Sequence, residues 1–269
     1  MLLLLATLAN AEFVLERVDV AIRDIKGDGS ARVHESIKFI IYGDYSNSIY
    51  ESGIPNNKLS FWSGNIGLKD VKMHTNAAKL DVRDFRLRPQ PKTKCNPIQN
   101  TCHGELILDY VTYPLYKDNS SLELVPGTGL FSIEKYKPRT KRYTINPASL
   151  SFTTTQDGNI ILEDNVYLTM ELPAESVTLD VNPQPTDTPL QLPSYVSSLS
   201  WTDIVLVKFS VIFDVEESID KEVADFFAGI LTGTSSAMAS PHGIALIALL
   251  CVLVGGYLYI TTSKKRGEE

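Results

Sequence analysis

A stretch of twenty residues without a charged side chain, GIALIALLCVLVGGYLYITT at 243–262, constrains this 269-residue chain more than any other feature. At 1.5 Å per residue, a helix of this length crosses the roughly 30 Å hydrocarbon core of a bilayer. Tyr257 and Tyr259 lie near its end, and the basic cluster 264–266 follows directly. Because such clusters favour the cytoplasmic side, we predict a transmembrane helix at 243–262 and a cytoplasmic tail at 263–269.

The first eleven residues, MLLLLATLANA, predict an export signal. Residues 2–8 are almost continuously apolar, and Ala9-Asn10-Ala11 has the small-x-small pattern of a cleavage site before Glu12. No basic residue precedes the apolar run, so an uncleaved N-terminal anchor is the alternative. Both readings export the residues that follow. With a cleaved signal and the C-terminal span, we predict a single-pass, type I protein of the cell membrane with the bulk of the chain extracytoplasmic.

The charge balance limits the classes of partner. The whole chain has 25 basic and 32 acidic residues. Without the tail's three basic and two acidic residues, 22 basic and 30 acidic residues remain, a net charge of about −8. Such a balance argues against nucleic acid and against docking on anionic lipid. The balance says little about which protein partner is favoured. For an exported, membrane-anchored chain we expect another envelope or membrane protein as the partner, and the membrane itself through the anchor.

The cysteines predict one disulfide. Cys251 lies in the predicted membrane span, which leaves Cys95 and Cys102 in KCNPIQNTCH. In an exported protein, two cysteines that frame a short turn favour a disulfide. The alternative is a metal site that adds His103, but this offers three ligands at a spacing unlike common zinc motifs. We predict no metal and no cofactor.

Apolar and polar residues alternate with a period of two through much of the body. The runs 13–25 and 31–42 flank the turn residues 26–30 and predict a β-hairpin. Further short strands follow without β-α-β alternation, which predicts an all-β fold, an antiparallel β-sandwich of one or two domains. These strands are expected at 66–75, 79–88, 104–113, 130–136, 141–145, 160–172, 176–181 and 203–215.

Turn-rich segments predict the domain boundaries. Pro126-Gly127-Thr128-Gly129 divides a first β domain at 12–125 from a second at 126–217, with the proline-rich segment 181–194 as the alternative boundary. Residues 218–242 follow as a juxtamembrane amphipathic helix and a stalk. We expect this helix to pack on the second domain, or alternatively to lie on the membrane surface.

The candidate binding residues are aromatic. Five rings occur within about 21 residues, among Ser, Gly and Asn, a composition typical of adaptable recognition loops. The alternative is a lid whose rings fold inward over the core. The five residues are Tyr42, Tyr45, Tyr50, Phe61 and Trp62.

A weaker second patch is basic. Arg139, Lys141 and Arg142 lie together in an acidic body, either facing an anionic partner or offset by neighbouring acids. Asn119 begins an Asn-Ser-Ser pattern for N-glycosylation, which has meaning only in a host that glycosylates exported proteins.

No sequence motif for catalysis stands out. The chain contains no HExxH, GxSxG, phosphate-binding loop or CxxC pair, and its four histidines have no obvious helper. We therefore predict no catalytic residue and no enzyme. The alternative is an exported hydrolase whose carboxylate site is assembled from distant segments, for example from Asp109, Glu123 and Glu134.

Two segments resemble a known family. ERVDVAIRDIKGDGSARVHESIKFIIYGDYSNSIYESGIP at 16–55 and GELILDYVTYPLY at 104–116 are similar to the N-terminal extracytoplasmic domain of uncharacterised predicted membrane proteins of bacteria and archaea. The shared plan comprises a strand, an Asp28-Gly29 turn, a strand with Val-x-Glu at 33–35, an aromatic run at 39–42 and Ile54-Pro55. The resemblance implies an exported β domain on a membrane anchor and implies no activity, cofactor or site residue.

These observations together predict a membrane-anchored extracytoplasmic binding protein. Its role would be adhesion, envelope organisation or service as an accessory subunit of a membrane complex. The exported hydrolase remains the alternative.

Overall fold

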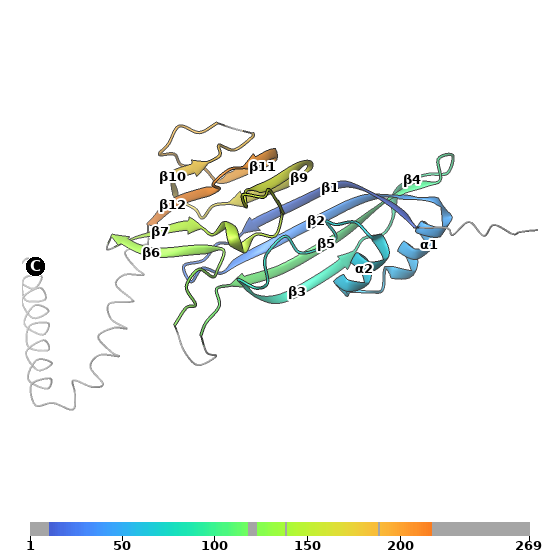
Figure 1. The fold of residues 1–269 in the computed structure, drawn as a ribbon, viewed down its shortest axis with the longest axis horizontal. Helices are drawn as coiled ribbons and strands as arrows, with labels where there is room; N and C mark the ends of the chain where they lie inside the picture. Colours follow the sequence, from blue (N-terminus) through green and yellow to red (C-terminus); the bar gives the residue numbers. More distant parts are fainter. Residues whose placement is uncertain (1–10, 118–122, 138, 188, 217–269) are drawn as a thin grey trace, which may run out of the picture. The chain divides into compact units, whose positions relative to one another are not determined.

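The predicted N-terminal hairpin forms the centre of a large sheet. The computed structural model describes residues 11–117, 123–137, 139–187 and 189–216 (Figure 1). In it, β1 (Glu12–Arg23) pairs antiparallel with β2 (Ala31–Tyr42). Val18, Val20 and Ile22 of β1 are buried, whereas the residues between them are partly or fully exposed. The alternation therefore separates a core face from an outer face, as period-two patterning requires.

Six further strands extend the large sheet on both sides of the hairpin. Beyond β2 lies β5 (Thr101–Tyr113), which pairs with β3 (Asp81–Pro89) and with the short β4 (Thr93–Asn96). Beyond β1 lies β9 (Ile160–Glu171), which pairs with β8 (Thr153–Thr154) and β11 (Ser198–Leu206). The sheet order is therefore β11-β9-β1-β2-β5-β3.

One pair corrects the prediction of purely antiparallel strands. β1 and β9 run parallel, with Val18 opposite Val166 and Ile22 opposite Met170. Parallel neighbours need a long crossover connection, and here the chain passes through β2 to β8 before it returns to β1. The fold is mostly β, with mixed strand directions in the large sheet.

Four strands form a second, smaller sheet. Its order is β10 (Val177–Asn182), β12 (Ser210–Glu216), β7 (Thr140–Ile145) and β6 (Phe131–Lys137), all antiparallel. A 3-10 helix at Pro147–Ser149 follows β7 and leads to β8. The rings of Tyr143 and Phe213 stack 4.9 Å apart and join the same core cluster as the large sheet.

The predicted boundary at 126–129 does not divide the body into two sheets. β9 and β11, which follow this segment, pair into the sheet that β1 and β2 begin. Gly127 and Gly129 have φ values of 70° and 91° and form a turn, so the glycine-rich signal marks a change of direction. The residues through Glu216 belong to one compact unit, which also contains the alternative boundary at 181–194.

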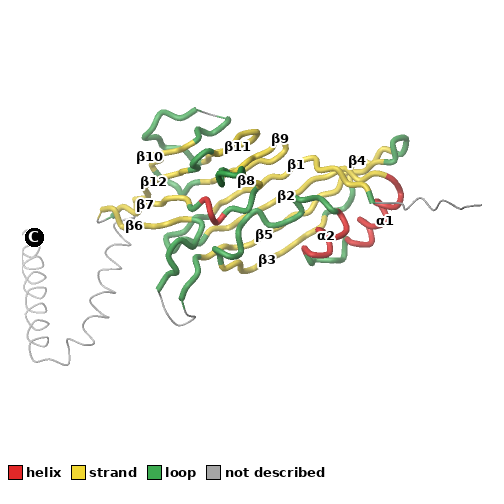
Figure 2. The backbone as a smooth tube through the Cα atoms, in the orientation of Figure 1, coloured by secondary structure: helices red, strands yellow, loops and turns green. Residues whose placement is uncertain are grey.

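The predicted loop between strands is helical. Residues after β2 form α1 (Gly43–Gly53) and α2 (Leu59–Ile66), drawn in red in Figure 2. Ser46, Tyr50 and Gly53 are the buried residues of α1, and their i, i+4, i+7 spacing is that of a helix face. The strand expected at 66–75 is absent, because Gly67 ends α2 in the left-handed conformation and turns follow it.

A chain of aromatic rings packs both helices on the large sheet. The ring of Phe39 on β2 lies 5.6 Å from that of Tyr50, which lies 5.3 Å from that of Trp62. All three side chains are fully buried. Gly104 on β5 makes this approach possible, since a Cβ there would lie 2.7 Å from Phe39 Cε2 and 2.9 Å from Tyr50 Cε2.

We expect Gly104→Ala to lower the free energy of unfolding by about 1 to 3 kcal/mol, because the added methyl group overpacks the aromatic chain. Gly64→Ala is the matched control: a Cβ at this exposed position in α2 meets nothing within 4 Å. Alanine is also the better helix former, so that variant should be neutral or slightly stabilising. Equal thermal unfolding of the two variants would contradict this packing account.

A buried carboxylate joins three parts of the chain. Glu35 on β2 is fully buried and accepts hydrogen bonds from the backbone amide of His74 at 2.9 Å, from His74 Nδ1 at 2.8 Å and from the Tyr110 hydroxyl. The His74 carbonyl accepts from the amide of Ser151 at 2.8 Å. Through His74, Glu35 therefore positions the connection between α2 and β3. This connection in turn hydrogen-bonds to the segment between β7 and β8.

The same network holds a charged histidine. Burial alone would lower the pKa of His74, but the nearby carboxylates of Glu35 and Asp70 outweigh burial and raise the pKa to about 9. Asp70 Oδ1 lies 3.9 Å from His74 Nε2, an ion-pair distance too long for a hydrogen bond. His74 is consequently protonated at neutral pH and forms a buried ion pair with Glu35.

The free energy of unfolding should therefore fall with rising pH. A histidine whose pKa is raised on folding contributes its full stabilisation below pH about 6.5 and loses it as pH rises through about 9. Denaturant unfolding from pH 6 to 9.5 measures this decline, which His103→Gln should retain because His103 lies outside the network. Constant or rising stability across this window would contradict the charged state of His74.

Several predicted segments fall outside the described residues. These are the export signal through residue 10, Asn119, the juxtamembrane segment 218–242, the transmembrane helix 243–262 and the tail 263–269. In the part of the chain that the structure describes, no helix is long and apolar enough to cross a membrane.

Candidate functional site

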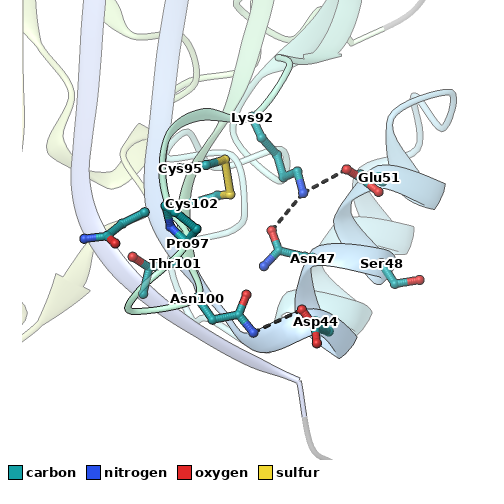
Figure 3. A pocket seen from close by; sticks show the side chains of 11 residues that line it. Asp44, Asn47, Ser48, Glu51, Lys92, Cys95, Pro97, Asn100, Thr101 and Cys102 are labelled. Carbon is teal, nitrogen blue, oxygen red and sulfur yellow. Dashed lines mark hydrogen bonds and ion pairs between the residues drawn. A yellow bond between two sulfur atoms is a disulfide. The ribbon is translucent and has the colours of Figure 1, made fainter.

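A pocket of about 420 Å³ lies between α1 and the β4–β5 hairpin (Figure 3). Asp44, Asn47, Ser48 and Glu51 of α1 form one wall. The hairpin with its disulfide and Lys92 form the other wall. Asn47 points across the gap toward Lys92, whereas Ser48 points away from the hairpin (Figure 3).

The predicted disulfide closes the hairpin. Cys95 and Cys102 are bonded, with their Cα atoms 4.1 Å apart, which confirms the sequence prediction. The sulfurs are therefore unavailable as metal ligands, and His103 Nδ1 lies 2.7 Å from Glu16 Oε2 instead. Among the described residues, no group of three or more metal-ligating side chains is gathered.

The tip of this hairpin is ordered by a side chain. Asn96 Oδ1 accepts hydrogen bonds from the amides of Ile98 and Gln99 at 2.9 and 3.2 Å. This Asx-type turn leaves the side chain of Ile98 95% exposed. The disulfide and the turn together present an apolar residue on a constrained loop.

Polar contacts connect the two walls of the pocket. Lys92 Nζ lies 2.9 Å from Asn47 Oδ1 and 2.8 Å from Glu51 Oε1. At the lower edge in Figure 3, Asn100 Nδ2 donates to Asp44 Oδ1 at 3.0 Å. Two carboxylates and one ammonium group give the lining a net charge of −1. The pocket therefore offers hydrogen-bond donors and acceptors to a polar group that is neutral or cationic.

The five predicted aromatic residues do not form one surface. Tyr50 and Trp62 are fully buried, and Tyr42 and Phe61 are partly buried. The Tyr50 hydroxyl donates to the carbonyl of Gln90 at 2.6 Å, and burial raises the pKa of Tyr50 to about 12. Tyr50 and Trp62 are therefore not surface binding residues, because their rings pack α1 and α2 on the sheet, as the alternative of rings folded inward over the core predicted. Tyr45 is 53% exposed and lies on the surface.

The predicted basic patch lies beside acids of the small sheet. Arg142 forms a bidentate pair with Asp214, at 2.8 and 2.9 Å, and stacks 3.7 Å over the Tyr136 ring. Arg139 Nη2 lies 3.2 Å from Glu216 Oε1. Lys141 is opposite Val215 on β12. The charges of both arginines are therefore offset by neighbouring acids, one of the two interpretations that the sequence left open.

The three carboxylates considered for hydrolysis are spread over different elements. Asp109 lies on β5 of the large sheet, where it bonds to His34. Glu134 lies on β6 of the small sheet, opposite Arg142. Glu123 forms an ion pair with Lys117. The three carboxylates therefore lie on three different segments, and two of them, Asp109 and Glu123, have their own basic partners.

Sequence reasoning missed the polar wall of the pocket, although a signal was present. Asp44, Asn47 and Glu51 recur with three- and four-residue spacing, which places them on one face of α1. Ser46, Tyr50 and Gly53 recur on the buried face. Aromatic, Ser and Asn content suggested a loop, whereas this two-sided helical period identifies an amphipathic helix.

Known proteins give no guide to the function of this chain. No family model and no curated protein matches the chain. Among solved structures, yeast LTA4 hydrolase in complex with bestatin is similar over 76% of this chain, at 8% identity and a TM-score of 0.31. This chain spans 29% of the length of that structure. A similarity this low carries no conclusion about function.

Removing the disulfide should destabilise the protein and loosen the pocket. For the short loop closed by Cys95 and Cys102, the chain-entropy model gives about 2 to 3 kcal/mol. The double variant Cys95→Ser/Cys102→Ser should unfold at a lower temperature, and reductant should lower that temperature in the wild type but not in the variant. Unchanged melting of the double variant would show that the hairpin is held by other contacts.

Proposed function

We propose that this chain is a membrane-anchored extracytoplasmic binding protein that engages a partner with the end of the body formed by α1 and the disulfide-closed hairpin. The role fits an adhesion protein, an envelope organiser or an accessory subunit of a membrane complex. The single observation that carries the proposal is Ile98, an apolar side chain that is 95% exposed at the tip of a loop constrained by a disulfide.

A constrained apolar tip is suited to binding. A loop whose backbone is ordered before association loses less conformational entropy when it binds, so more of the interaction energy appears as affinity. An apolar side chain held in water at a protruding position gains by burial against a partner. Tyr45, 53% exposed on α1, adds an aromatic contact of the kind enriched at interaction hot spots.

The pocket beside the hairpin supports a protein partner. Its amides, carboxylates and one ammonium group resemble the polar rim that surrounds the apolar centre of protein interfaces. A backbone amide or a basic side chain of the partner complements a lining with a net charge of −1. The disulfide supports an oxidising compartment, which agrees with an extracytoplasmic location at the cell membrane.

Site-specific photo-crosslinking in intact cells tests this proposal. A photoreactive residue placed at position 98 of the full-length protein should yield one stoichiometric crosslinked partner, identified by mass spectrometry. Position 207 is the matched control, since Val207 is 49% exposed and follows β11 rather than α1. Crosslinks of equal yield at both positions, or none at position 98, would contradict a partner site at this end.

Two tyrosine variants sharpen the test. Tyr45→Ala should leave the melting temperature unchanged and reduce the yield of the crosslink at position 98 at least fivefold. Tyr195→Ala, at a residue 78% exposed in the segment before β11, should change neither quantity. Equal loss of crosslinking in both variants would point to a general effect of removing a surface ring.

A further inference from the structure

The outer face of the large sheet holds a second cavity, of about 410 Å³. It lies at the opposite end of β2 from α1: Arg32 precedes Tyr42 by ten residues of strand, roughly 30 Å. Four guanidinium groups and two carboxylates line it, which leaves two positive charges in excess in a chain of net charge −7. The charged lining residues are Arg23, Arg32, Arg86, Arg88, Asp84 and Asp109.

The Asp109 carboxylate contacts three basic side chains at or beside this cavity. Asp109 lies 2.7 Å from His34 Nδ1, forms an ion pair with Arg88 and lies 3.9 Å from Arg23 Nη2. Burial raises the pKa of Asp109, but the hydrogen bonds from His34 and Arg88 outweigh burial and lower it. Asp109 therefore stays ionised. Its single negative charge already interacts with Arg88 and Arg23, so it cannot compensate the other arginines of the cavity as well.

The remaining cations lack full compensation. Within the described residues, Arg86 forms no ion pair, and the buried Nε of Arg23 has no hydrogen-bond partner. Asp24 Oδ2 lies 3.4 Å from Arg32 Nη1. If Asp24 is counted with the lining residues, four arginines face three aspartates, and the cavity still has one positive charge in excess. A buried donor without a partner is costly, and an added acceptor would satisfy it.

The strand register brings these cations together against their mutual repulsion. Arg23 on β1 is directly opposite Arg32 on β2, and like charges at such positions are destabilising. On β3, the pairing with β5 skips from Arg83 to Arg86, with Asp84 at a φ of 55°. This bulge places Arg86 opposite Asp109 and turns β3 locally, as bulges do.

We propose that Arg23, Arg32, Arg86 and Arg88 form a binding site for a small, multiply charged oxyanion of the phosphate or polycarboxylate class. Guanidinium groups bind both kinds of oxygen in bidentate geometry. The cavity volume falls in the range of small-molecule sites. An oxyanion here accepts from Arg86 and Arg23 and removes the repulsion between Arg23 and Arg32. This site is separate from the proposed partner surface.

Calorimetric titration of the intact full-length protein tests the site. The probes are inorganic pyrophosphate and citrate, each at constant ionic strength, so that the tighter binder distinguishes phosphate from carboxylate chemistry. We expect at least one probe to bind and to raise the melting temperature. Arg86→Gln should weaken that binding at least tenfold, because it removes a donor that has no structural partner. Higher salt should weaken binding as well.

Arg83→Gln is the matched control on the same strand. Arg83 pairs with Asp81 and stacks on Tyr113 outside the cavity, so its loss should change affinity by less than twofold. Absence of binding by both probes in the millimolar range, or equal weakening by the two variants, would overturn the proposal. The crosslink at position 98 should be unchanged in Arg86→Gln, so the two proposals succeed or fail separately.

Discussion

The arrangement of the body depends on the buried carboxylate of Glu35. It accepts hydrogen bonds from two groups of His74 and from Tyr110, so its charge is compensated inside the core. The segment it fixes contacts the connection between β7 and β8 through the isolated bridge of Thr75 with Leu150. Breaking a buried ion pair by removing one partner typically costs about 3 to 5 kcal/mol. One interaction thus couples the large sheet, the α2 connection and the route to the small sheet.

The two surfaces that we propose for binding differ in their chemistry. At the α1 end, aromatic packing fixes the helix, and the disulfide fixes the facing hairpin, so Ile98 and the polar pocket are presented on ordered elements. At the other end of β2, the sheet itself orders the arginine cavity. Both proposed surfaces are built on regular elements or on the disulfide-closed hairpin, so binding there would order few further residues and would cost little conformational entropy.

The sequence predicted those features that depend on local pattern. The hairpin of β1 and β2 followed from period-two alternation, and the Cys95–Cys102 disulfide followed from spacing and compartment. The parallel pairing of β1 with β9 was missed, because it joins residues about 150 positions apart and leaves no local mark. Tyr50 and Trp62 were misassigned because composition does not reveal exposure. The arginine cavity was missed because strand register alone gathers its residues.

Hydrogen exchange of the full-length protein, compared between wild type and Glu35→Gln, tests the central claim most directly. Glutamine keeps the shape of the side chain but removes its charge and one acceptor. The account predicts faster exchange at residues 66–80 and 149–152, with the β1–β2 hairpin still protected, whereas Glu105→Gln on the outer face leaves these segments unchanged. Unchanged exchange in Glu35→Gln, or a uniform rise across the whole body, would contradict the coupling assigned to Glu35.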